Sequence, residues 1–164
     1  MKSLGILWNS SSCFKDEIKS DVKEYAKIIG TITIDLEDNY EEFVREIYAQ
    51  DDIAKWKVDK KLETMFLCTS NKIINVLIMD IDVEEQYYHP HKKRMVYKNL
   101  EQMKIDIREK YSKKVPVYFF DNVFHVTDNE NEFYLDYEVI KKYMKIGKVI
   151  ESEFSEKSKV KKKV

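Results

Sequence analysis

The stretch KIINVLIMDID, residues 72–82, decides the fold of this chain. It is a nearly continuous run of Ile, Val, Leu and Met, and it has the length of a single strand. A continuous apolar run of this kind indicates a strand that is buried on both faces. We therefore predict a central strand here, and the fold then depends on the elements before and after it.

A strand, a helix and a second strand are predicted before the central strand. The apolar run at residues 4–8 ends in Asn-Ser-Ser-Ser, which is typical of a strand that leads into a helix. Ser11 or Ser12 can cap that helix, because serine side chains accept hydrogen bonds from the free N–H groups of a first turn. Apolar residues then recur at helical spacing until Gly30, where we expect the helix to end. Residues 31–37 alternate as in a half-buried strand.

Further helices and a last strand complete the predicted order. Asn39 resembles a helix cap, residues 51–67 are helical or irregular, and Asn99 can cap another helix. The last strand is predicted at residues 115–120, VPVYFF, and a final helix at residues 129–144. Strands separated by helical crossovers in this order predict an α+β fold, namely a ferredoxin-like βαββαβ sandwich with additional helices.

Length and charge bound the class of protein. A chain of 164 residues fits one domain, which we place at residues 1–150, followed by a basic and disordered tail at residues 151–164. The 29 Lys and Arg residues balance 30 Asp and Glu residues, which argues against a general nucleic-acid binder. The first apolar run is too short for a signal peptide or a membrane span. Cys13 and Cys68 lack CxxC spacing, so we predict a protein of the reduced cytoplasm without disulfides.

Candidate functional residues gather in FDNVFHVTDNENEF, residues 120–133. If the last helix begins near Asn129, His125 lies on the loop that enters its N-terminus, where free N–H groups and the helix dipole favour anions. A neutral imidazole beside a phosphate can attack phosphorus and become a phosphohistidine. The positions of Asn122, Thr127 and Asp136 along the chain would allow these residues to assist the imidazole of His125. Helix capping alone accounts for TDNENE, and a structural role for His125 is the alternative.

The pattern Asn-x-x-His-x-Thr-Asp resembles the signature of the nucleoside diphosphate kinase family. The resemblance implies that His125 is the phosphorylated nucleophile, that Asp136 orients its imidazole and that Asn122 and Thr127 contact the nucleotide. It also implies a ferredoxin-like fold, Mg²⁺ bound together with the nucleotide, and a homo-oligomer. Nucleotide or another phosphorylated small molecule is then the expected partner, with no specific nucleic acid and no membrane.

Three further residues follow from the same resemblance. Arg108, in the segment DIREKY, and Arg94, in KKRMVYKN, are similar to arginines that bind phosphate, and Tyr48 is similar to a tyrosine packed near the histidine. The family places a phosphate-binding lysine at the end of its first strand, whereas this chain has ILWNSSS there. Three other functions are therefore considered. They are phosphoryl transfer on a non-standard substrate, a non-catalytic interaction module and a nucleotide sensor without turnover.

His89 and His91 form a His-x-His pair that is the alternative candidate site. Two imidazoles can ligate a transition metal, but no third ligand with suitable spacing stands nearby. Pro90 between them indicates an exposed turn, so we predict no metal site in the protein itself.

Overall fold

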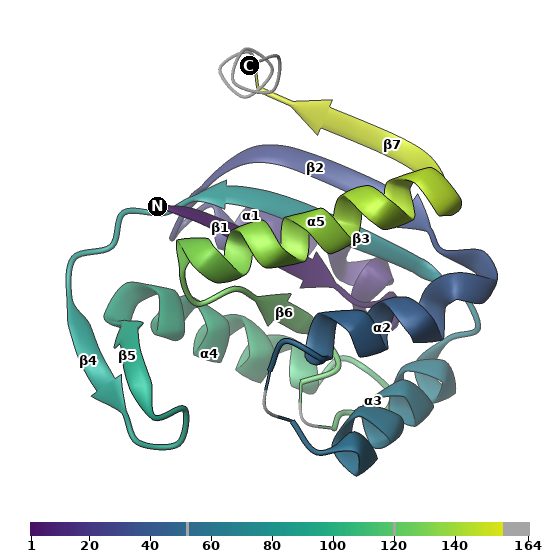
Figure 1. Cartoon of the computed structure of the whole chain (residues 1–164), viewed down its shortest axis with the longest axis horizontal. Coiled ribbons are helices and arrows are strands. Elements are labelled where there is room, and N and C mark those ends of the chain that lie inside the picture. The colour runs from purple at the N-terminus through teal and green to yellow at the C-terminus, as the bar shows by residue number, and fades with distance from the viewer. Residues whose placement is uncertain (52, 120, 156–164) are drawn as a thin grey trace.

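The strands of the sheet come from both ends of the chain. In the computed structural model, which describes residues 1–51, 53–119 and 121–155, one sheet has five strands in the order β6-β1-β3-β2-β7 (Figure 1). All neighbouring strands in it are antiparallel. The strands are β1 (Lys2–Leu7), β2 (Lys27–Asp35), β3 (Ile73–Asp80), β6 (Phe124–Val126) and β7 (Lys148–Phe154). The strand predicted at residues 72–82 is confirmed as the middle strand, β3.

Helices pack on both faces of this sheet. They are α1 (Lys15–Val22), α2 (Tyr40–Tyr48), α3 (Lys55–Cys68), α4 (Lys98–Ser112) and α5 (Glu130–Ile146), with short 3-10 turns η1 (Asn9–Phe14) and η2 (Glu37–Asn39). The units β1-α1-β2 and β3-α4-β6 interleave so that β1 and β3 are neighbours, which is the ferredoxin-like arrangement. The predicted fold class is therefore confirmed, with α2, α3, α5 and β7 as additions.

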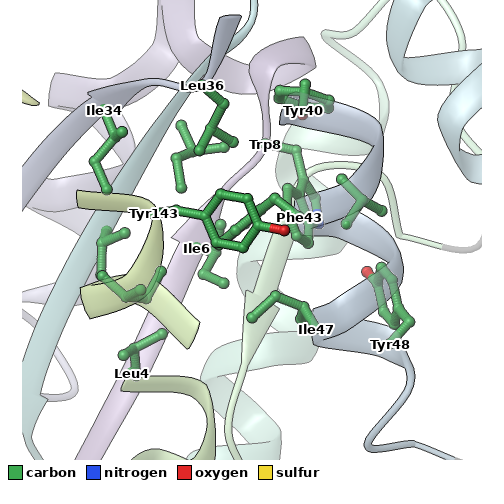
Figure 2. Packing of buried hydrophobic residues seen from close by; sticks show 14 of the residues in the cluster. Leu4, Ile6, Trp8, Ile34, Leu36, Tyr40, Phe43, Ile47, Tyr48 and Tyr143 are labelled. Carbon is green, nitrogen blue, oxygen red and sulfur yellow. The ribbon is translucent and has the colours of Figure 1, made fainter. Parts of the chain in front are cut away.

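Alternation along the central strands creates two cores. Leu4 and Ile6 of β1 point toward α2, α3 and α5, whereas Leu7 points toward α1 and α4. Trp8 lies at the centre of the first core, fully buried against Phe43 of α2 (Figure 2). Each fully buried side chain of this size contributes about 1.5–3 kcal/mol to the stability of the fold. The two cores therefore fix how the helices that carry the site pack on the sheet.

The N-terminus of α5 confirms the predicted cap. Asn129 Oδ1 accepts a hydrogen bond from the Glu132 backbone N–H at 2.9 Å, and Glu132 Oε1 accepts one from the Asp128 backbone N–H at 3.1 Å. The pair is similar to a capping box, except that Glu132 accepts from the residue before the cap, and the helix starts at Glu130. Asn39 likewise precedes α2, although its side chain makes no capping bond.

The last strand of the ferredoxin-like core was predicted in the wrong place. Residues 115–119 form no strand, and the strand that pairs with β1 is Phe124–Val126; Phe120 lies outside the described residues. Side chains hold the segment in a turn instead, because Asn122 Nδ2 donates to the Val117 carbonyl at 2.8 Å. Asp121 also has a φ of 58°, which a strand residue does not adopt.

Gly30 and Asn99 do not have the predicted roles. The first helix ends at Val22, and Gly30 lies inside β2, where an added Cβ would come within 2.7 Å of the Phe154 ring. Gly30 is thus required by the close approach of β7 and does not end a helix. Asn99 lies in the first turn of α4, one residue past its start, and its amide donates to the Asp82 carbonyl.

Two elements of the structure were not predicted. Strand β7 pairs with β2 along its length, so the expected domain boundary at residue 150 falls inside a strand, and residues 151–154 belong to the sheet. Residues 156–164 lie outside the described part. A separate hairpin joins β4 (Gln86–His89) to β5 (Arg94–Tyr97), and its turn contains the exposed Pro90 that was predicted to mark one. No helix in the described part of the chain is long and apolar enough to cross a membrane.

Candidate functional site

His125 lies in the middle of a strand, and the prediction that it lies on a loop was wrong. It is the central residue of β6 and pairs with Ile6 of β1. Its two strand neighbours, Phe124 and Val126, point into the core beneath α1 and α4. The alternation of a strand therefore turns the imidazole to the opposite face, where α2 and α5 lie.

On that face, Asp136 of α5 contacts the imidazole. The distance from His125 Nε2 to Asp136 Oδ2 is 3.0 Å. Both side chains are largely buried, with exposed fractions of 12% and 5%. A carboxylate can only accept here, so it selects the tautomer with the proton on Nε2 and leaves the Nδ1 lone pair available. The expected pairing of these two residues is thus present in the structure.

Aromatic rings enclose the imidazole. The ring of Tyr48, at the end of α2, meets it edge-on with centroids 5.4 Å apart and an interplanar angle of 81°. The Trp8 ring lies 6.2 Å away. Burial, together with the nearby Asp121 carboxylate, raises the pKa of Tyr48 well above its ordinary value, so its phenol stays neutral. Tyr48 therefore lies beside the histidine, as the resemblance implies.

Arg108 is held against the strand that carries His125. Its Nε donates to the Phe124 carbonyl at 3.1 Å and lies 2.7 Å from Asp121 Oδ2. The Asp121 side chain in turn accepts a hydrogen bond from the Phe124 backbone N–H at 3.1 Å. The structure thus brings Arg108 to the segment immediately before His125; that it binds phosphate stays a prediction.

Arg94 takes part in a partly buried ionic cluster. Its guanidinium pairs with Asp128 and, at 3.2 Å, with Glu132. Asp128 also contacts Lys104 of α4 and, at 3.2 Å, Lys92 of the hairpin turn. Arg94 is therefore already paired with two carboxylates, and no contact between it and His125 exists in the described structure.

Glu101 completes this cluster. It lies 2.7 Å from the Lys92 ammonium and 3.2 Å from the Lys104 ammonium. Burial would raise the pKa of Glu101, but the two ammonium groups hold it below its ordinary value. The cluster ties the hairpin to α4 and to the start of α5.

Asn122 and Thr127 point into the protein. The Asn122 amide donates to Thr64 Oγ1 at 3.2 Å and to the Val117 carbonyl, and the residue is fully buried. Thr127 Oγ1 accepts from the Leu4 backbone N–H at 2.9 Å. Both residues thus hold together segments of the fold around His125, and their predicted contacts with a nucleotide remain predictions.

Three residues near His125 were not singled out in the sequence. Two of these residues are Lys61 of α3 and Asp121, which both lie near Tyr48 and Arg108. Burial raises the pKa of Asp51, and the nearby imidazole of His125 opposes that shift. Lys61 shares a helical face with the buried Val58, Leu62 and Met65, and this spacing is the sequence signal that it points inward.

Metal-binding groups are sparse in the described part of the chain, where no three His, Cys, Asp or Glu side chains are placed to hold an ion. The His89 and His91 rings lie 6.0 Å apart, and His89 Nδ1 already accepts a hydrogen bond from the Lys92 backbone N–H. Mg²⁺ needs few protein ligands when phosphate oxygens supply the others.

Among solved structures, the chain is similar in fold to a nucleoside-diphosphate kinase. That structure is a transition state mimic of nucleoside-diphosphate kinase from Borrelia burgdorferi with bound vanadate and ADP, 13% identical to this chain, with 85% of each chain covered and a TM-score of 0.46. No family model and no curated protein matches the chain. The ferredoxin-like assignment therefore rests on the strand order and pairing described above.

Proposed function

We propose that this protein is a nucleotide-binding phosphotransferase that forms a phosphohistidine at His125. The observation that carries the proposal is the 3.0 Å contact between His125 Nε2 and Asp136 Oδ2. It leaves Nδ1, which makes no hydrogen bond within the described structure, as the nucleophilic atom. Arg108 and the enclosing aromatic rings supply positive charge and shelter from water on the same side of the molecule.

The reaction would proceed in two displacements. In the first, Nδ1 attacks the terminal phosphorus of a nucleoside triphosphate, so that a P–N bond forms and the bond to the bridging oxygen breaks, releasing the diphosphate. Asp136 stabilises the positive charge that develops on the imidazole. In the second, an oxygen of the acceptor attacks the phosphohistidine, and the P–N bond breaks. Mg²⁺ bound to the phosphates would offset their negative charge. The acceptor is a nucleotide or another phosphorylated small molecule.

Incubation with ATP labelled at its terminal phosphate and Mg²⁺ tests this function. We expect an acid-labile and base-stable label on the protein, which His125→Ala abolishes. His91→Ala is the matched control, because His91 is exposed on the hairpin turn, and it should keep the label. Circular dichroism establishes that both variants are folded. A folded wild-type protein that stays unlabelled over a range of ATP concentrations would disprove phosphohistidine formation from ATP.

A nucleotide sensor without turnover is the second candidate. It is favoured by the carboxylate partners of the two arginines, since Arg108 is paired with Asp121 and Arg94 with Asp128. A phosphate would have to compete with these carboxylates. This candidate predicts that nucleotides raise the melting temperature while no phosphate is transferred.

Two further proposals concern the cellular location and the oligomeric state of the protein. We infer a cytoplasmic protein, since Cys13 and Cys68 are both free thiols in the structure. The homo-oligomer implied by the family resemblance is tested by sedimentation velocity.

A further inference from the structure

Lys61 is a buried lysine on the face of α3 that meets the rest of the protein. Its exposed fraction is 6%, which is unusual for a side chain that carries charge. Its ammonium lies 3.3 Å from the Tyr48 hydroxyl, 3.3 Å from the Asp121 carbonyl and 4.6 Å from the centroid of the Tyr48 ring. The positive end of Lys61 is therefore held by the same tyrosine that packs against His125.

The Asp121 turn places a second cation next to this lysine. While the Asp121 carbonyl accepts from Lys61, its carboxylate lies 2.7 Å from Arg108 Nε. One residue thus holds both cations by different groups. Asp121 has a left-handed backbone, with a φ of 58°, and lies in the turn three residues before β6 begins.

The guanidinium of Arg108 has further N–H donors besides Nε. Within the described structure, all hydrogen bonds of Arg108 are donated by its Nε. The acceptor is the Phe124 carbonyl. The terminal guanidinium nitrogens can therefore bind a planar pair of phosphate oxygens, whereas the ammonium of Lys61 acts as a point charge. The two groups complement each other in the way that a polyphosphate requires.

We propose that Lys61 and Arg108, joined by the Asp121 turn, form the polyphosphate subsite of the His125 site. The ligand class is a nucleoside triphosphate or another chain of phosphoryl groups. The inference rests on the proposed function, which it deepens by naming α3 as the source of a phosphate-binding cation. Neither Lys61 nor Asp121 takes part in bond making, and both act by holding the phosphates.

The protonation of Lys61 gives the subsite a pH dependence. Burial lowers the pKa of Lys61 to about 8, the Asp121 carboxylate raises it, and the Arg108 guanidinium lowers it. Asp51 and Lys57 face it as well and act in opposite directions. The ammonium is therefore mostly charged at pH 7 and is lost as the pH rises past 8, so polyphosphate binding should weaken there.

Inorganic triphosphate is the probe, because it tests the subsite without requiring catalysis. Its dissociation constant is measured by calorimetry for wild type, Lys61→Met, Lys61→Arg and Lys60→Met. We expect Lys61→Met to weaken binding about tenfold, since a charged hydrogen bond is lost, and Lys61→Arg to stay within about threefold of wild type. Lys60→Met is the matched control on the same helix, because Lys60 is exposed, and it should bind as wild type does.

The outcomes separate the subsite from the proposed function. Equal binding by Lys61→Met and wild type would overturn the subsite, even if His125 is labelled by ATP. Lysine-dependent triphosphate binding without any labelling would uphold the subsite and reject the phosphohistidine. If Lys61→Met does not fold, the pH dependence decides: wild-type binding must weaken above pH 8 and that of Lys61→Arg must not. A ratio of wild-type to Lys61→Arg affinity that is constant from pH 7 to 9.5 would overturn the proposal, since triphosphate ionises equally in both measurements.

Discussion

His125 and Asp136 join the shortest strand of the sheet to the longest helix through a contact of 3.0 Å between Nε2 and Oδ2. Asp136 follows His125 by eleven positions, and the segment between them includes the turn that caps α5, so the Asn129 cap also sets the place of the carboxylate. Whatever displaces the start of α5 should therefore also move the partner of the imidazole.

Asp136→Asn should slow labelling of His125 by about 10²-fold, a loss of the size that removing one electrostatic stabiliser of a transition state produces. The amide keeps the shape of the carboxylate but not its charge, so the imidazolium loses its stabilisation. Rapid-quench measurement of labelling gives the rate. Asp106→Asn is the control, because Asp106 contacts Tyr25 on another face of the molecule. Equal rates for Asp136→Asn and wild type would show that the pair does not assist phosphorylation.

Asp128→Asn should lower the free energy of unfolding by about 3–5 kcal/mol, because it breaks buried ion pairs and leaves Lys104 without a full countercharge. The melting temperature should fall by roughly 10 °C for a domain of this size. Urea unfolding measures the change, and Glu85→Gln is the control. Glu85 pairs with Lys98 on the exposed surface at 3.4 Å, and its loss should cost less than about 1 kcal/mol.

The free energy of unfolding should rise between pH 8 and 10, in part because of Lys61. The folded chain releases the Lys61 proton near pH 8, whereas the unfolded chain keeps it until about pH 10.5. Within this window the unfolded state binds more protons, so raising the pH favours folding. Urea titrations at several pH values should show a smaller rise for Lys61→Met than for wild type. Parallel curves for the two proteins would contradict the lowered pKa.

Gly5→Ala should destabilise the pairing of β1 with β6. An added Cβ would lie 2.6 Å from the Phe124 ring, so the ring or the strand must move, at a cost of about 1–3 kcal/mol. Thermal unfolding measures this cost. The double variant Gly5→Ala/Phe124→Leu tests the cause, since the smaller leucine should recover part of the loss. Strictly additive effects would show that the two residues do not compete for space.

The central strand and the last helix can be predicted because their signals are local. A strand buried on both faces is mostly apolar, as residues 72–82 are, and Asn129 followed three positions later by Glu132 is the pattern of a helix cap. The spacing of His125 and Asp136 along the chain likewise indicates a pair, and the two side chains do meet.

The remaining strands depend on contacts between distant segments. Strand β6 has three residues, too few for a pattern of alternation, and pairing with β1 creates it. Residues 115–119 have a stronger preference for strands, but the bond from Asn122 to the Val117 carbonyl holds them in a turn. Strand β7 is almost wholly exposed, so it lacks the apolar face by which strands are recognised.

The site is only partly visible in the sequence for the same reason. Tyr48 and Arg108 were predicted near His125, but their distances from it depend on how α2 and α4 pack. Lys61 comes from residues 51–67, which were predicted as helical or irregular, so the inward signal in its spacing with Val58, Leu62 and Met65 was not used. The family that the chain resembles has a lysine at the end of its first strand, which this chain lacks; Lys61, which contacts Tyr48, comes from α3.

Strands β6 and β7 occupy opposite edges of the sheet (Figure 1). An anchor or fluorophore attached just after Phe154 would thus be separated from His125 by the width of three strands. Immobilising the protein on a sensor surface through that end leaves the histidine edge facing the solution. The edge of the sheet that carries Phe154 is therefore a suitable attachment point for single-molecule or surface-based measurements of ligand binding.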